Sequence, residues 1–223
     1  MGKLTSAKSM MEAILLVLLD KRPKTDAMFI HGSSVTDPGL DDATLKLSRE
    51  TLKRGDIGRI VINGVSESVC NEKNLAYFGC EPWLRTLAIL GVERKDIVVL
   101  PESLHTAAES GNLITLALQS GWQSLTIFAL PHHILRCMLQ IVYLMEQRHV
   151  FLKVYARTLD SVDWNMDAEK TVLGGGFISG TMFNHIAAEY KRVEKYKRRD
   201  RVGFTPHATV GELIEYIHKR DGV

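Results

Sequence analysis

Polar and titratable side chains directly follow four short apolar runs of the sequence. The residues that could form a site are, in chain order, His31, Gly32, Ser33, Asn63, Gly64, Glu102, Ser103, His105, Thr106, His132, His133 and Arg136. Their hydroxyl, amide and imidazole groups can hydrogen-bond a polar, nucleoside-like ligand, and a guanidinium group can bind an anion. His133 is the best candidate for a general acid–base catalyst, because imidazole titrates near neutral pH.

Glycines and helix starts among these residues favour a phosphorylated or otherwise anionic ligand. Gly32 and Gly64 let the backbone approach a ligand closely and accept positive φ angles. Pro131 suits the first position of a helix, which would put the two histidines after it in the opening turn and Arg136 on the same face. A helix N-terminus favours anions and neutral imidazoles, so Arg136 is expected to supply the fixed positive charge.

Several of these residues also have a less specific interpretation. Thr106-Ala-Ala-Glu109 matches a capping box, in which Thr106 caps a helix and Glu109 reaches back to its backbone. Glu102 fits an ordinary exposed loop carboxylate as well as a ligand contact. Ser33, or the serine after it, could act as a nucleophile with His133 as its base, although the chain has no Gly-x-Ser-x-Gly elbow there.

A metal site is a further hypothesis, because four histidines and a carboxylate fall among the same residues. His31, His105, His132 and His133, with Glu102, offer the imidazole and carboxylate ligands of a zinc or iron site. No His-x-x-x-His or His-Glu-x-x-His spacing supports that hypothesis. We therefore expect no metal ligands, and a metal-dependent hydrolase stays an alternative.

The apolar runs predict strands that are covered on both faces, as in a parallel sheet, since they show little polar alternation. They span residues 27–30, 60–62, 97–100, 125–130 and 150–155. Segments with helical spacing alternate with them, at residues 6–19, 40–54, 83–90, 106–120, 132–147, 177–199 and 210–219. This order predicts right-handed βαβ units in a doubly wound, Rossmann-like three-layer α/β/α sandwich. The carboxyl ends of parallel strands share one edge, so the polar residues that follow them should meet there.

Length and composition are those of an ordinary globular domain. The 223 residues are 45% hydrophobic and 24% charged, which excludes disordered and fibrous classes. We expect one domain, with the α/β core at residues 24–157 and a loop and two helices at 158–223. A net charge of +2 is too small to indicate a nucleic-acid partner.

Cysteine spacing and hydropathy predict a cytoplasmic protein. Cys70, Cys80 and Cys137 are odd in number and form no CxxC pair, which argues against disulfides and favours a reducing compartment. The apolar run at residues 13–19 is too short to span a membrane, and charged residues follow it at once.

Four motifs resemble those of the YdcF-like family, a bacterial domain of unknown function that occurs in the SanA and ElyC envelope proteins. The motifs are Asp26-Ala-Met-Phe-Ile-His-Gly-Ser-Ser-Val, Asn63-Gly64-Val65, Ser103-Leu-His-Thr-Ala-Ala-Glu and His133-Ile-Leu-Arg136. They occur in the family's order over residues 24–157. The resemblance implies a Rossmann-like fold and a small polar ligand, with S-adenosylmethionine-like nucleosides as candidates. It implies no established reaction.

The sequence departs from the family at four places. His105 stands where Asn is usual, and His132 where Tyr is usual. Two serines follow Gly32 in place of glycines, and Glu109 lies one residue late. We expect this protein to lack the membrane anchor of the envelope members.

The leading hypothesis is a small-ligand-binding protein for a nucleoside-type or phosphorylated metabolite, and whether it is also a transferase or a hydrolase is left open. A non-catalytic sensor or scaffold in cell-envelope biogenesis is the alternative. Glycines 174–176 are expected to form a hinge within a long connection. The basic stretch from Lys191 to Arg201 is expected to be a solvated helix face, with contact to an anionic surface as its second interpretation.

Overall fold

A computed structural model describes residues 6–32, 38–73, 75, 77–172, 176–196 and 206–223. Its centre is a five-stranded sheet, all parallel, in the order β3-β2-β1-β4-β5. The strands are β1 (Ala27–Ile30), β2 (Ile60–Ile62), β3 (Ile97–Val99), β4 (Ser124–Phe128) and β5 (Lys153–Arg157). The apolar runs thus form the predicted strands, with two strands at the predicted ends and the ends of the other three shifted by at most three residues.

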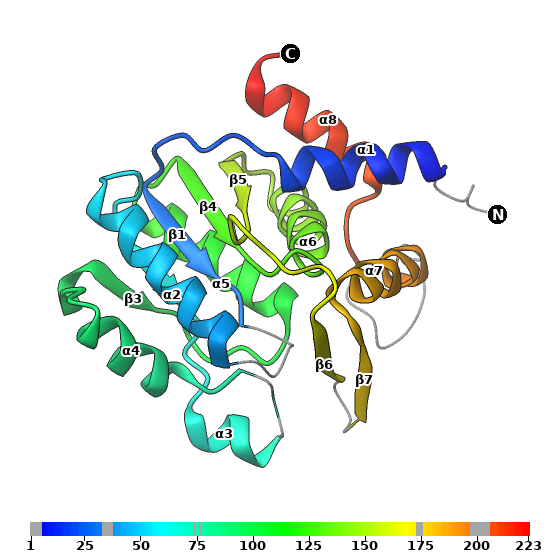
Figure 1. The fold of residues 1–223 in the computed structure, drawn as a ribbon. Helices are drawn as coiled ribbons and strands as arrows, with labels where there is room; N and C mark the ends of the chain where they lie inside the picture. Colours follow the sequence, from blue (N-terminus) through cyan, green and yellow to red (C-terminus); the bar gives the residue numbers. More distant parts are fainter. Residues whose placement is uncertain (1–5, 33–37, 74, 76, 173–175, 197–205) are drawn as a thin grey trace.

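Helices cover both faces of the sheet, so the predicted three-layer sandwich is confirmed (Figure 1). The alternating side chains of β1 show the two layers. Ala27 and Phe29 pack with one group of helices, and Met28 and Ile30 pack with the other. The first group is α1 (Ala7–Leu18), α5 (Thr106–Gln119), α6 (Ile134–Gln147) and α8 (Val210–Asp221). The second group is α2 (Pro38–Lys53) and α4 (Cys80–Ile89).

Two connections contain regular structure that periodicity did not reveal. The connection after β2 holds a short helix, α3 (Glu67–Glu72), and a 3-10 turn, η1 (Arg94–Asp96), precedes β3. The connection after β5 holds β6 (Asp167–Val172), which pairs antiparallel with β7 (Gly176–Thr181). Gly174 and Gly175 of the expected hinge lie outside the described residues.

The helix expected at residues 177–199 begins later, as α7 (Met182–Tyr196), so the prediction was wrong for 177–181. Its apolar spacing continues into β7 by chance, because adjacent large residues in a strand can mimic one turn of a helical stripe. The buried face of α7 carries Met182, His185, Glu189 and Val193. Phe183, which the predicted stripe included, is 64% exposed. Residues 197–201 of the basic stretch lie outside the described residues.

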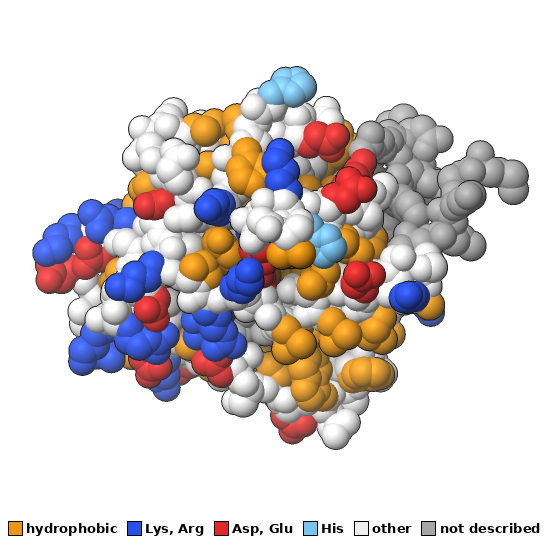
Figure 2. All heavy atoms as spheres, turned by 90° about the horizontal axis from the view of Figure 1, so that it is seen from above, with side chains coloured by type: hydrophobic (Ala, Val, Ile, Leu, Met, Phe, Trp, Pro, Cys, Tyr) orange, Lys and Arg blue, Asp and Glu red, His pale blue; other side chains and the backbone are white. Residues whose placement is uncertain are grey.

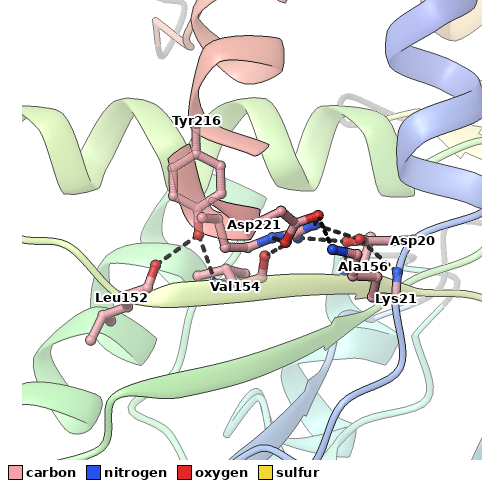
Figure 3. Close-up of polar contacts among 8 residues, drawn as sticks. Asp20, Lys21, Leu152, Val154, Ala156, Tyr216 and Asp221 are labelled. Atoms are coloured by element: carbon pink, nitrogen blue, oxygen red, sulfur yellow. Dashed lines mark hydrogen bonds and ion pairs between the residues drawn. The ribbon is translucent and has the colours of Figure 1, made fainter. Parts of the chain in front are cut away.

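Side chains from α8 and from the connection after α1 cover the outer edge of β5 (Figure 3). The Tyr216 hydroxyl accepts from the Val154 N–H and donates to the Leu152 carbonyl, at 2.7 Å each. Arg220 donates to the Val154 carbonyl, and Asp20 accepts from the Ala156 N–H. An edge strand whose N–H and C=O groups are occupied offers no template for a further strand.

None of the helices in the described part of the chain is long and apolar enough to cross a bilayer. The three cysteines are all free and buried.

Candidate functional site

The candidate site lies at the carboxyl ends of β1 and β4, where the strand order reverses. The chain runs from β1 outward through β2 to β3, and then returns to the other side of β1 as β4. His31 directly follows β1, and His133 follows β4 after a short turn. Both histidines are buried, and their ring centroids lie 5.8 Å apart. Open α/β sheets bind ligands at this kind of switch point.

A buried carboxylate holds His31 and the end of β2 together. Glu109, from the first turns of α5, accepts from His31 Nδ1 at 2.9 Å through one oxygen and from Asn63 Nδ2 at 2.9 Å through the other. The Asn63 amide also bonds to the Ser103 backbone, donating to its carbonyl at 2.7 Å and accepting from its N–H at 3.1 Å. Three sequence-distant turns are thereby fixed to one helix.

The charge of this pair follows from its surroundings. Burial alone would lower the pKa of His31, but Cys137 and Glu109 beside the ring raise it to about 10. His31 is therefore an imidazolium at neutral pH. Its second ring nitrogen, Nε2, is buried and forms no hydrogen bond to any described residue.

A second group of contacts joins α5, α6 and α7. Thr106 Oγ1 hydrogen-bonds His133 Nε2 at 3.1 Å and accepts from Arg136 Nη1 at 3.1 Å. Arg136 Nε also donates to Glu189 Oε2 at 3.0 Å. The fixed positive charge that the sequence predicts at Arg136 is present, but a buried carboxylate of α7 shares it.

His132 faces α7 rather than the first turn of α5. Its Nδ1 lies 3.3 Å from the Met182 sulfur, and its ring centroid lies 5.8 Å from that of His185. The rings of His132 and His133 are nearly parallel, with centroids 6.3 Å apart. The C-terminal extension thus forms a wall of the site.

Local geometry differs from the sequence expectations at both helix starts. α6 begins at Ile134, so Pro131 lies in the preceding turn and His133 is the N-cap. The capping box was also wrong. His105 is the N-cap of α5 and accepts from the Ala108 N–H. Thr106 and Glu109 face the site instead, because β1 and α6 offer both side chains buried polar partners.

The structure does not bring every predicted residue into this network. Glu102 and His105 are exposed, and Ser33 lies outside the described residues. Neither Gly32 nor Gly64 has a positive φ angle. A side chain at Gly64 would collide with the Leu100 carbonyl, and one at Gly32 would press on the Tyr77 ring. Close packing within the protein accounts for both glycines.

The sequence analysis considered Glu109 only as a capping residue and did not consider Glu189. Glu109 precedes the fully buried Leu113 by four residues, so helical periodicity already places it on the inner face of α5. Glu189 stands in the same relation to Val193 on α7. No sequence signal paired either carboxylate with its partner.

Among the described residues, no group of three or more His, Cys, Asp or Glu side chains is arranged to hold a metal ion. A scan against models of protein families and a search among curated proteins found no match to this chain.

Proposed function

We propose that this protein binds a small nucleoside-type or phosphorylated metabolite at the carboxyl edge of its sheet. One observation carries the proposal, namely that His31 and His133 meet at the switch point between β1 and β4. Topology alone explains why residues about 100 positions apart are neighbours there. The motif resemblance to the YdcF-like family supports the same edge as the ligand site.

The charged side chains of the site suit a ligand that has a positive and a negative charge, or one that has a phosphate group. The His31 imidazolium faces Glu109, and the Arg136 guanidinium faces Glu189, so each cation is paired with a carboxylate. A zwitterion such as S-adenosylmethionine can pair its negative charge with a cation of the site and its positive charge with a carboxylate. No buried charge is then left without a partner. The His133 side chain makes no capping bond to α6, which keeps that helix N-terminus suited to a phosphate or carboxylate.

His133 is the residue that we assign to proton transfer if the bound metabolite reacts. Its Nε2 is hydrogen-bonded to Thr106, whose hydroxyl also accepts from Arg136, so the ring orientation is fixed. A positioned imidazole contributes about 100- to 10,000-fold to proton-transfer reactions. The reaction class that this arrangement supports is group transfer or hydrolysis. The buried free cysteines support a reducing, cytoplasmic location.

The first test is native mass spectrometry of freshly purified protein, followed by calorimetric titration with S-adenosylmethionine. We expect a retained small molecule or saturable binding. A Thr106→Val variant should weaken that binding about tenfold, because it removes the hydroxyl that joins His133 and Arg136. Arg148→Ala is the matched control, since Arg148 lies at the far end of α6 and bonds to Gly111 and Thr115.

Recovery of the bound molecule after incubation separates an enzyme from a sensor. An enzyme returns it chemically changed, and a sensor or scaffold returns it intact. No retained molecule together with no saturable binding would contradict the proposal. Equal affinities in the Thr106 and Arg148 variants would remove this cluster from the ligand site.

A further inference from the structure

The outer face of α1 is apolar, although this helix lies at the surface of the protein (Figure 1). The residues of its inner face are buried in the core, namely Met10, Ala13 and Val17. On the outer face, Met11, Leu15 and Leu19 are 57%, 48% and 78% exposed. They follow one another at intervals of four residues and form one stripe about 12 Å long. We name these three side chains the α1 stripe.

Packing within the protein does not account for the α1 stripe. Residues 13–19 are apolar without interruption. A helix that is apolar on all sides is normally buried, whereas a surface helix presents polar residues to water. α1 packs against α6, α8 and β5 through its inner side alone. The α1 stripe therefore indicates an apolar partner outside the chain.

Exposed cations lie at both ends of the α1 stripe. Lys8 lies three residues before the stripe begins, on the same side of the helix. Lys21, Arg22 and Lys24 follow the stripe directly, in the exposed connection to β1. Glu12 is the single carboxylate in α1. The surroundings of the stripe thus carry an excess of positive charge.

Carboxylates near these cations leave them available to an external anion. Lys21 lies 3.1 Å from Asp221, a carboxylate that Arg220 already binds at 2.9 Å. Arg22 lies 2.6 Å from Asp160. The Lys21 and Arg22 side chains are 62% and 53% exposed. Ion pairs of exposed side chains contribute little stability, so a phosphate group can replace either carboxylate.

The connection that carries three of these cations is fixed to the sheet. Asp20, directly after the α1 stripe, accepts from the Ala156 N–H at 2.8 Å and from both Nη groups of Arg220 (Figure 3). Its charge is thereby balanced inside the protein. The contact also holds the basic segment close to the end of the stripe.

The stripe and the cations share one face of the molecule. Figure 2 looks onto the face that carries α1, α8 and the connection between α1 and β1. On it, hydrophobic side chains form a group on the side of α1, and Lys and Arg side chains gather toward α2, α4 and β3. A bilayer with anionic lipids offers acyl chains to such a stripe and phosphate groups to such cations.

A second copy of the chain matches this face less well. A stable protein interface takes about 20–30 residues on each side, and the α1 stripe supplies three apolar ones. Two copies would also bring faces with the same excess charge together.

We propose that α1 docks this protein on the surface of a bilayer that contains anionic lipids. The α1 stripe enters the boundary between headgroups and acyl chains, with the helix parallel to the membrane plane. Lys8, Lys21, Arg22 and Lys24 contact the lipid phosphate groups. The connection from α1 enters β1 at its amino end, so docking leaves the candidate site at the carboxyl end accessible. The inference is therefore independent of the proposed metabolite.

The test is flotation of the full-length protein with vesicles of equimolar phosphatidylcholine and phosphatidylglycerol, and with vesicles of phosphatidylcholine alone. We expect flotation with the anionic vesicles, much less with the neutral ones, and a loss of binding as the salt concentration rises. No binding to the anionic vesicles, or equal binding to both kinds, would overturn the proposal. A dimer in solution that Leu19→Gln abolishes would show that a second copy covers the stripe instead.

Substitutions test which side chains carry the binding. Leu19→Gln should weaken vesicle binding about tenfold, because a largely exposed leucine no longer enters the acyl region. Its matched control is Ile89→Gln, since Ile89 is 85% exposed on α4, which covers the other face of the sheet. Lys24→Gln should weaken binding about fivefold, and Lys73→Gln at the exposed end of α3 should not. Equal losses in a variant and its control would contradict docking through α1.

Discussion

At the scale of single residues, the site depends on carboxylates that hold cations inside the protein. Glu109 bonds to His31 and Asn63, and Glu189 bonds to Arg136. A buried ion pair contributes little net stability compared with apolar packing, but the loss of one partner leaves a charge without compensation. These contacts therefore serve geometry more than stability, because they fix the directions of two basic groups at the strand ends.

The raised pKa of His31 predicts that part of the folding free energy depends on pH. In the folded protein the pKa is about 10, and in the unfolded chain it is about 6.5. The contribution of His31 is therefore fully present below pH 6.5 and is lost as the pH rises through 10. We expect the unfolding free energy of the wild type to fall by on the order of 5 kcal/mol across this interval, measured by urea unfolding.

A Glu109→Gln variant provides the comparison. It removes the carboxylate that favours the imidazolium, so its unfolding free energy should fall less over the same interval. Parallel pH profiles in the two proteins would show that Glu109 does not set the charge of His31.

At the scale of elements, the chain after β2 lies so close to the chain after β3 that position 64 has no room for a side chain. Leu100 donates its N–H to the Ile62 carbonyl, which brings the chain after β3 against the chain after β2. A Cβ atom at Gly64 would lie 2.1 Å from the Leu100 oxygen. The glycine after β2 is thus required by the approach of two backbones.

Gly64→Ala should destabilise the protein by about 1–3 kcal/mol, because the backbone of Leu100 must move to admit the methyl group. Gly211→Ala is the control on an exposed position of α8, and it should stabilise by about 0.5 kcal/mol through helix propensity. Thermal unfolding of the two variants measures both effects. A neutral Gly64→Ala would show that the strand ends separate easily.

At the scale of the whole molecule, the C-terminal segment completes what the α/β core leaves open. α7 contributes Met182, His185 and Glu189 to the site, while α8 covers the edge of β5. Asp20 and Arg220, 200 positions apart, form a bidentate ion pair with contacts of 2.6 and 2.8 Å. The first and last helices are therefore tied to each other and to the sheet (Figure 1).

Arg220→Met should cost about 3–5 kcal/mol of unfolding free energy, since it leaves the Asp20 carboxylate, only 2% exposed, without its partner. Adding Asp20→Asn should restore part of that loss, because the unpaired charge is then gone. Urea unfolding of both single variants and the double variant gives the coupling energy. Additive losses would show that the two residues act separately.

The spacing of apolar residues was sufficient to predict most helices and strands of this fold, because the local pattern of apolar residues depends directly on which residues are buried. The runs at residues 27–30 and 60–62 are strands with those ends, since strands buried on both faces must be apolar throughout. The hairpin of β6 and β7 was missed because an isolated antiparallel pair shows no long apolar run. The start of α7 was misplaced for the same local reason, as Phe177 and Ile178 resemble a helical stripe.

Within the site, residue types and strand ends indicated where His31, Asn63, Thr106, His133 and Arg136 would meet. The roles of Glu109 and Glu189 could not follow from spacing. A carboxylate on the inner face of a helix looks the same in sequence whether it caps a helix or binds a histidine from another strand. The partner is chosen by packing across the sheet.

The sequence by itself determined the alternation of strands and helices, and hence the edge of the sheet at which the polar turns collect. Burial and chain connectivity decide the alternation of the elements and the edge at which the turns meet. Each of these properties produces a repeating pattern of apolar and polar residues along the sequence. Only the tertiary structure decided the charge of His31 and the sharing of Arg136 with α7. Those properties arise from distances between residues far apart in sequence, and a pairwise distance leaves no trace in the local pattern.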